Sequence, residues 1–171
     1  MLPSPVSPYN RAMRRSEREI TSRDEIDAIL LRERTLRVAF AANNEPYVVP
    51  LSYGYDQKNG ALYMHTAAVG RKLEFIARNP RVCFEVEGST SLRPADTACA
   101  WGLDYESVIG YGRVSEVVDS EEKAHALRCL MRQQTGASTM WTFAAKELSV
   151  TRVWALLIES VTGKRTSPPT S

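Results

Sequence analysis

Apolar positions recur at helical spacing in three parts of the chain. The segments are residues 21–34, 71–80 and 120–134. In the first, Ser22 and Glu25 have the spacing of a capping box, which marks a helix N-terminus. Pro80 marks the end of the second segment, and Gly136 follows the third. The pattern therefore predicts three amphipathic helices.

Between these helices, β-branched and aromatic residues predict six strands. The six are "TLRVAF" (35–40), "PYVVPLSYGY" (46–55), "ALYMHT" (61–66), "RVCFEV" (81–86), "YESVIGYGRVSEVV" (105–118) and "VTRVWALLIES" (150–160). The turn-forming links "NNEP" and "DQKNG" join the first three. Antiparallel strands can be joined by such short links, whereas parallel strands need longer crossovers. The predicted fold class is mainly β, a six-stranded antiparallel barrel with helices on its outside.

Three further segments have weak or interrupted patterns. The stretch from Gly88 to Leu103 has no sustained period and is predicted to be a long loop. Gly110 and Gly112 interrupt the fifth predicted strand, as is typical of a bend or bulge. The segment around Trp141 favours neither helix nor strand.

We expect a flexible basic arm over residues 1–19, one domain over 20–164 and a disordered tail over 165–171.

Composition and charge narrow the class of protein. The chain is 43% hydrophobic and 25% charged, and no apolar run approaches the roughly 20 residues of a membrane span. Its N-terminal segment lacks the apolar region of a secretory signal, so we expect a cytoplasmic protein without a membrane partner. A net charge of +2 is too small to indicate nucleic acid, and Glu17 and Glu19 interrupt the basic arm.

The cysteines and histidines predict no metal centre. Cys83, Cys99 and Cys129 are odd in number, widely spaced and never in a C-x-x-C pair, which is typical of free thiols. His65 and His125 are the only two histidines, and the sequence brings no further ligands to either. A packed or surface imidazole is the default interpretation of each.

The stretch "HTAAVGRK", from His65 to Lys72, combines the groups that recognise a phosphate. Thr66 offers a hydroxyl, Gly70 permits close approach of the backbone, and Arg71 and Lys72 begin a predicted helix. Two cations at a helix N-terminus are unfavourable unless an anion lies beside them. An ordinary strand-to-helix connection with an exposed Arg-Lys pair is the alternative.

A family resemblance favours the phosphate interpretation. Four segments stand in order: "YVVPLSYGY" (47–55), "LYMHTAAVGRKLEFIARNPRVCFEV" (62–86), "CAWGLDYESVIGYGRVSEV" (99–117) and "TGK" (162–164). In these segments the chain resembles the pyridoxamine 5'-phosphate oxidase-like FMN-binding split barrels, and most closely the nitroimidazole-resistance (Nim-type) flavoproteins. The resemblance extends from about Arg14 to Lys164.

The resemblance implies a Greek-key split barrel that forms a homodimer and binds FMN at the subunit interface. By the same resemblance, the backbone of one strand would run along the isoalloxazine; its residues are Val48, Val49, Pro50, Leu51, Ser52 and Tyr53. His65 and Thr66 would flank the ribityl and phosphate groups, and Arg71 and Lys72 would grip the phosphate. Ser107 would place a polar side chain near the flavin ring.

The resemblance also implies an activity. Nim-type relatives suggest an FMN-dependent reductase of nitroaromatic acceptors, with electrons from a reduced nicotinamide or another donor and with His65 as the candidate catalytic residue. Vitamin B6 oxidation is disfavoured because no histidine follows His125. The alternatives are a flavin carrier or sensor without turnover, and a split barrel that binds F420 or haem.

Overall fold

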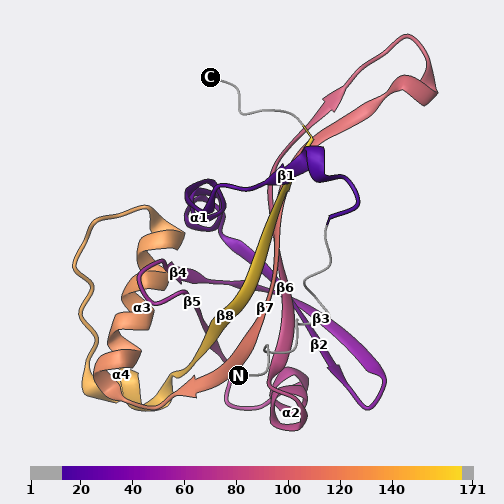
Figure 1. The fold of residues 1–171 in the computed structure, drawn as a ribbon. Coiled ribbons are helices and arrows are strands. Elements are labelled where there is room, and N and C mark those ends of the chain that lie inside the picture. The colour runs from indigo at the N-terminus through magenta and orange to yellow at the C-terminus, as the bar shows by residue number, and fades with distance from the viewer. Residues whose placement is uncertain (1–12, 167–171) are drawn as a thin grey trace, which may run out of the picture.

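Antiparallel pairing joins eight strands into one sheet in the computed structural model, which describes residues 13–166 (Figure 1). The strands are β1 (Glu19–Ile20), β2 (Thr35–Ala42), β3 (Glu45–Ser52), β4 (Gly54–Asp56), β5 (Ala61–Thr66), β6 (Arg81–Arg93), β7 (Gly102–Val117) and β8 (Arg152–Arg165). Their order in the sheet is β3-β2-β6-β7-β8-β5-β4, with β1 paired to β8.

The sheet curls into a barrel that pairing does not close. Its path ends at β3 and at β4, while β3 and β5 contact each other without hydrogen-bonded pairing. The predicted split barrel is confirmed. The sheet holds more strands than the six expected for two reasons. Strand β1 has only 2 residues, too few for a period-2 pattern to be visible, and the strand predicted over 46–55 is divided at Tyr53 into β3 and β4.

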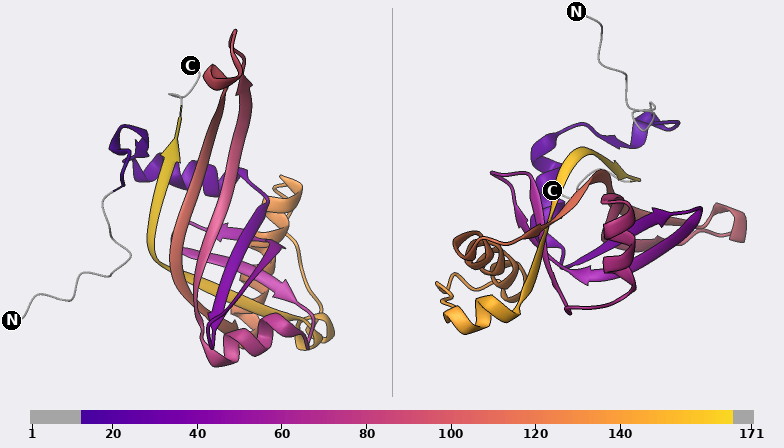
Figure 2. Two further views of the ribbon diagram at one scale, coloured as in Figure 1. Left: turned by 90° about the vertical axis from the view of Figure 1, so that its right-hand side faces the viewer. Right: turned by 90° about the horizontal axis from the view of Figure 1, so that it is seen from below.

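The three predicted helices are confirmed as α1 (Arg23–Arg32), α2 (Arg71–Arg78) and α3 (Ser120–Thr135). The Ser22 hydroxyl accepts the backbone N–H of Glu25 at 3.4 Å and caps α1 as its spacing predicts. A fourth helix, α4 (Ala145–Val150), and two short 3-10 turns, Ser16–Arg18 and Ala98–Ala100, were not predicted. In Figure 2, α2 covers one end of the barrel and α3 and α4 lie together on its side.

The prediction of a long loop over Gly88–Leu103 is wrong. Strand β6 continues to Arg93 and β7 begins at Gly102, so the two strands form a long hairpin that projects from the barrel (Figure 1). From Glu87 to Arg93, every side chain except Gly88 is exposed. Because neither face of this segment packs on a core, its sequence carries no alternation of apolar and polar residues.

The bulge expected at the two glycines is confirmed. The register of β7 on β8 shifts between Tyr111 and Gly112. A Cβ atom at Gly112 would lie 2.2 Å from the backbone oxygen of Leu157, so the two backbones pass too closely for any side chain there. Strand β8 thereby pairs with β7 along its whole length while its first half also pairs with β5.

The ends of the chain extend the folded part slightly beyond the expected domain. Glu19 and Ile20 pair with Lys164 and Gly163, and Ile20 is buried. Thr166 follows β8, where its hydroxyl accepts the backbone N–H of Tyr105 at 2.8 Å. The rest of the expected arm up to residue 12, and the tail from 167, lie outside the described residues. Between residues 13 and 166, no helix is long and apolar enough for a membrane crossing.

A close contact holds α3 against β4. A Cβ atom at Gly54 would lie 2.2 Å from the backbone nitrogen of Leu130 and 2.4 Å from the carbonyl carbon of Cys129. Only glycine permits this distance, because the opposing atoms belong to helix backbone that cannot move aside. Gln133 strengthens the contact by accepting the backbone N–H of Tyr55 at 2.7 Å.

We predict that Gly54→Ala destabilises the fold by roughly 1–3 kcal/mol or more, as overpacked substitutions do. Urea unfolding followed by circular dichroism measures the effect. Gly60→Ala is the control, because open space surrounds Gly60 and only its positive φ of 60° penalises alanine. Equal unfolding free energies for the two variants would contradict the packing argument.

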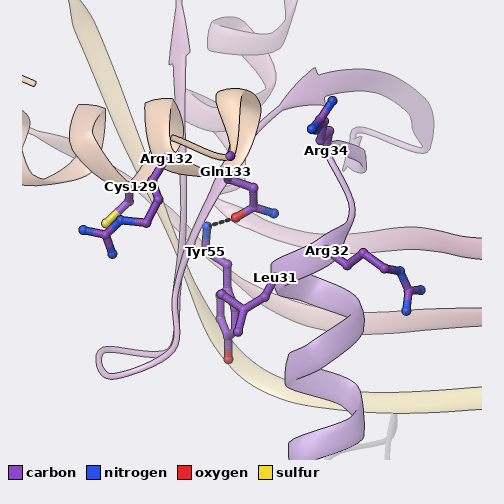
Figure 3. Close-up of a pocket in the computed structure, with 8 residues that line it drawn as sticks. Leu31, Arg32, Arg34, Tyr55, Cys129, Arg132 and Gln133 are labelled. Carbon is purple, nitrogen blue, oxygen red and sulfur yellow. Dashed lines mark hydrogen bonds between the residues drawn. The ribbon is translucent and has the colours of Figure 1, made fainter. Parts of the chain in front are cut away.

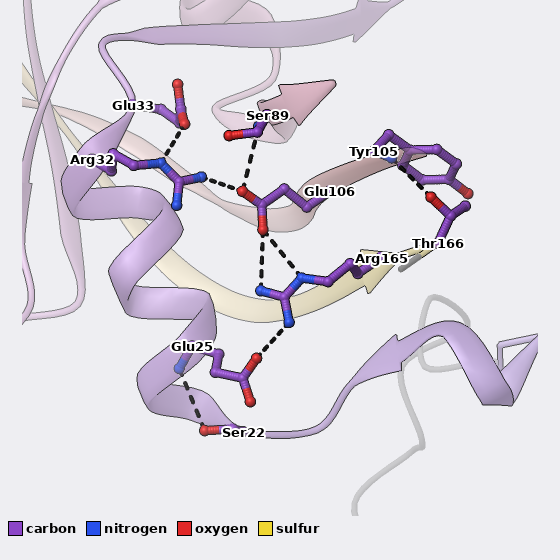
Figure 4. A network of polar contacts seen from close by, with 9 residues as sticks. All are labelled: Ser22, Glu25, Arg32, Glu33, Ser89, Tyr105, Glu106, Arg165 and Thr166. Carbon is purple, nitrogen blue, oxygen red and sulfur yellow. Dashed lines mark hydrogen bonds and ion pairs between the residues drawn. The ribbon is translucent and has the colours of Figure 1, made fainter. Parts of the chain in front are cut away.

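A buried carboxylate ties α1 to the sheet (Figure 4). Glu106 of β7 forms ion pairs with Arg32 of α1 and with Arg165 of β8, the latter at 3.1 Å. Arg165 also pairs with Glu25 of α1 at 2.6 Å. Burial alone would raise the pKa of Glu106, but hydrogen bonds from Arg165 and the charge of Arg32 lower it overall.

Because the pKa of Glu106 is lower in the folded chain than in the unfolded one, its contribution to stability is present above the unfolded pKa of about 4.3 and is lost as the pH falls through the folded pKa. We predict that Glu106→Gln costs about 2 kcal/mol at neutral pH and flattens the decline of stability in acid. Urea titrations at several pH values measure both effects. Glu87→Gln, which removes an exposed ion pair with Arg37, should change little.

Candidate functional site

The end of β5 places His65 and Thr66 at the barrel mouth, next to the loop that leads into α2. His65 is exposed. The Thr66 hydroxyl accepts the indole N–H of Trp154 at 3.1 Å and donates to the backbone oxygen of Ala67 at 2.9 Å. Thr66 is thus held in place, and its hydroxyl must rotate away from Ala67 before it can donate to a ligand.

The N-terminus of α2 carries no side-chain cap. Gly70 occupies the N-cap position and has no side-chain oxygen to accept the first N–H groups of the helix, although its backbone oxygen accepts the N–H of Leu73 at 2.9 Å. Helices α1 and α3 differ, since Ser22 and Asp119 cap them. The N-terminus of α2 therefore presents amide N–H groups and a positive dipole end at the surface.

Arg71 and Lys72 add two cations at this point. Arg71 forms an ion pair with Glu45 of β3, and its guanidinium lies 4.8 Å from the centroid of the Tyr47 ring. These contacts tie α2 to β3 and engage one of the several N–H donors of Arg71, leaving others free to bind an anion. Among the described residues, Lys72 forms no ion pair.

Arg152 supports the same loop and was missed in the sequence. It lies opposite Thr66 in the pairing of β5 with β8 and donates to the backbone oxygen of Ala68 at 3.1 Å. A bidentate ion pair with Glu116, at 2.8 and 2.5 Å, fixes its orientation. The only signal in the sequence was that Arg152 stands two residues before Trp154 in a predicted strand. That position does not reveal its ion-pair partner, Glu116, which lies on another strand.

The edge of β3 is open. Val48, Pro50 and Ser52 are exposed, whereas Tyr47, Val49 and Leu51 pack against the core. The two-residue turn between β2 and β3 pairs Ala42 with Glu45, so odd-numbered residues of β3 bond to β2 and even-numbered ones direct their backbone groups outward. The backbone of Val48 and Ser52 is therefore available to a ligand along this edge.

Tyr53 does not lie on this open edge of β3 but in the core. Its side chain is fully buried, and its hydroxyl donates to the backbone oxygen of Leu30 at 2.7 Å. Burial raises the pKa of this phenol above its usual value. Its backbone oxygen accepts the side-chain amide of Gln134 at 2.9 Å. Tyr53 therefore belongs to the core and has no surface exposed to a ligand.

Ser107 is not brought to the β3 edge within one chain. It lies on β7 between Glu87 of β6 and Lys164 of β8. Strands β2 and β6 separate β7 from β3, a distance of about 14 Å at the usual strand spacing. The structure thus places Thr66, Arg71 and Lys72 beside the loop that leads into α2, with His65 next to Thr66 but on the opposite face of β5, and leaves Ser107 apart from them.

A second group of chemically active side chains was missed in the sequence. Asp56, at the end of β4, accepts a hydrogen bond from His125 Nε2 at 2.7 Å, and Cys129 Sγ lies 3.6 Å from the same nitrogen. The i, i+4 spacing of His125 and Cys129 on a helix was the available signal. Burial raises the pKa of the Cys129 thiol, and both contacts fall on one imidazole nitrogen, so the three do not form a nucleophile–base–acid triad.

A cavity of about 240 Å³ lies between α1, β4 and α3 (Figure 3). Its lining includes Arg32, Arg34 and Arg132, but their guanidinium groups point in different directions. This cavity therefore offers no convergent anion site, unlike the N-terminus of α2.

Comparison with known proteins identifies the family to which the chain belongs. The family model of pyridoxamine 5'-phosphate oxidase matches residues 22–165. The chain belongs to this family, as its sequence motifs predict. A search of the curated proteins finds no match.

Solved structures share the fold. A proposed 5-nitroimidazole antibiotic resistance protein from Bacteroides thetaiotaomicron is 29% identical with a TM-score of 0.75, and the match covers 86% of each chain. A FAD-binding protein from Mesorhizobium loti is 28% identical with a TM-score of 0.63, covering 88% of this chain and 98% of that one. The flavocytochrome Anf3 from Azotobacter vinelandii, 22% identical with a TM-score of 0.78, covers 95% and 76% and supports the fold alone.

Proposed function

We propose that the protein binds FMN between two copies of the chain and acts as a flavin-dependent reductase of nitroaromatic compounds. A reduced nicotinamide or another donor would supply the electrons. The uncapped and doubly cationic N-terminus of α2, beside the open edge of β3, is the observation that carries the proposal. Family membership and the likeness to proteins described as FAD-binding or as conferring nitroimidazole resistance support it.

The residues at the barrel mouth fit a phosphorylated flavin. Lys72, the free donors of Arg71 and the first N–H groups of α2 match the acceptor oxygens of a phosphate. Arg152 holds the loop in this shape through Ala68. Along β3, exposed Val48 and Pro50 offer apolar surface, and the outward backbone groups offer directed hydrogen bonds, as a flavin ring requires.

When bound, FMN supplies the electron transfer itself, and the protein decides which donor and acceptor reach it. His65 is exposed at the end of β5, two residues from the loop. An imidazole there can donate a proton to a reduced acceptor. We therefore assign proton delivery to His65.

A second copy of the chain completes this site. Ser107 cannot reach the β3 edge of its own chain, so its contact with the ring requires the partner copy. Ile109, two residues away on the same face, is 44% exposed, and the projecting hairpin exposes Leu92, Trp101 and Leu103. Apolar surface of this kind is typical of an interface.

A non-catalytic flavin carrier or sensor is the second candidate. One observation favours it: among the described residues, no hydrogen bond orients the His65 ring. Efficient proton delivery usually requires a second group that positions the imidazole.

We predict that the purified protein retains FMN after gel filtration and that Arg71→Ala with Lys72→Ala reduces its affinity at least 100-fold. Two charge-assisted contacts of roughly 1.5–3 kcal/mol each justify this magnitude. Visible absorption and flavin fluorescence titration measure it. Retention of F420 or a Soret band from haem in place of FMN would overturn the cofactor assignment.

Glu45→Gln separates phosphate binding from a structural role of Arg71. If Arg71 binds phosphate, removing the competing carboxylate leaves the affinity for FMN equal or higher. If Arg71 serves only to tie α2 to β3, Glu45→Gln weakens flavin retention as much as Arg71→Ala does.

Light scattering should show a dimer at micromolar concentration, and a monomer that still holds FMN would contradict the shared site.

The reductase and the carrier differ in turnover. We predict that a reduced nicotinamide bleaches the bound flavin and that a nitroaromatic acceptor restores its colour repeatedly. In the reductase, His65→Gln should lower turnover at least tenfold while flavin retention stays unchanged. Flavin that no donor reduces would favour the carrier, and a variant with the wild-type turnover would remove the role of His65.

A further inference from the structure

The three side chains of Asp56, His125 and Cys129 converge on one point outside the proposed flavin site. Their ligand atoms, a carboxylate oxygen, an imidazole nitrogen and a thiol sulfur, all lie within 4.8 Å of one another. Asp56 and Cys129 are each 8% exposed. His125 lies between this buried pair and the surface, since 44% of its side chain is exposed.

The hydrogen bonds around His125 indicate what can occupy this point. The ionised carboxylate of Asp56 can only accept, so His125 Nε2 carries the proton of the 2.7 Å contact. Cys129 Sγ, at 3.6 Å from the same nitrogen, also directs a lone pair toward that proton. The carboxylate oxygen, the imidazole nitrogen and the thiol sulfur thus surround a single proton. A metal ion can take the position of that proton and bind all three atoms.

From these contacts, we propose that Asp56, His125 and Cys129 form a site for Zn²⁺ or a similar borderline-soft divalent cation, with water as the fourth ligand. A tetrahedral zinc ion holds N, O and S ligands at about 2.0–2.3 Å, which places the ligand atoms roughly 3.5 Å apart. The observed separations of 2.7 and 3.6 Å bracket this value. On binding, the Cys129 thiol releases its proton to solvent, and the His125 ring carries its proton on Nδ1 so that Nε2 is free to ligate the metal.

The framework holds the ligands ready. His125 and Cys129 are one turn apart on α3, and the close contact at Gly54 brings this face of the helix onto β4. Asn59 donates to Asp56 Oδ2 at 2.8 Å and orients the carboxylate. Such outer hydrogen bonds fix the ligands of metal sites.

The surroundings favour a cation. An open hollow of about 740 Å³ lies beside His125 and gives access from solvent. Its charged lining consists of Asp119, Glu121, Glu122 and Arg128. Three carboxylates against one guanidinium leave an excess of negative charge at the entrance.

Cobalt binding to tag-free, chelator-treated full-length protein tests this site. We expect Co²⁺ to give a near-ultraviolet sulfur-to-metal charge-transfer band and the visible bands of tetrahedral coordination, and Zn²⁺ to displace it. Cys129→Ser should abolish the charge-transfer band, and His125→Gln should weaken binding at least tenfold. Cys83→Ser and His65→Gln are the matched controls and should leave the spectrum unchanged.

Thermal unfolding provides the second readout. Zn²⁺ should raise the melting temperature of the wild type and not that of Cys129→Ser, because a ligand stabilises only the state that binds it. If Cys129→Ser fails to fold in chelator, His125→Gln replaces it, since the half-exposed side chain of His125 tolerates substitution. Absence of the charge-transfer band in the wild type, or its loss in Cys83→Ser instead, would overturn the proposal, and neither result bears on flavin binding.

Discussion

The close passage of β7 along β8 is the constraint on which the rest of the molecule depends. Both strands are long, and their pairing shifts register where Gly112 lies directly against the backbone of Leu157. One half of β8 pairs with β5 and holds the loop of Thr66 through Arg152. The other half ends in Arg165, which fixes α1 through Glu106 and Glu25. A single bent strand therefore positions elements at both ends of the barrel.

The sequence predicted most of this architecture because the strands are rich in β-branched and aromatic residues and the helices carry apolar residues at helical spacing. Strand "ALYMHT" and helix 71–78 have the expected positions. The projecting hairpin was missed, since its side chains from Ser89 to Arg93 are exposed in the described part of the chain and so carry no period. For the same reason its ordered pairing depends on backbone hydrogen bonds, which no side-chain pattern records.

The candidate sites divide in a similar way. The candidate phosphate-binding stretch was visible because its residues are contiguous. Arg152, and the group of Asp56 with His125 and Cys129, were not, since each depends on contacts between segments far apart in the chain. Pairing across strands and the packing of α3 on β4 create these sites, and a single sequence does not specify either one.

The prolines of β3 have a consequence for the free edge of the sheet. Pro46 and Pro50 are among the residues whose backbone groups point outward, and proline has no N–H to donate. A strand from another molecule would therefore find two gaps in the ladder and pair poorly. Small ligands need only one or two of the remaining groups. The edge can thus stay open for recognition while the protein avoids the edge-to-edge association that leads to aggregates.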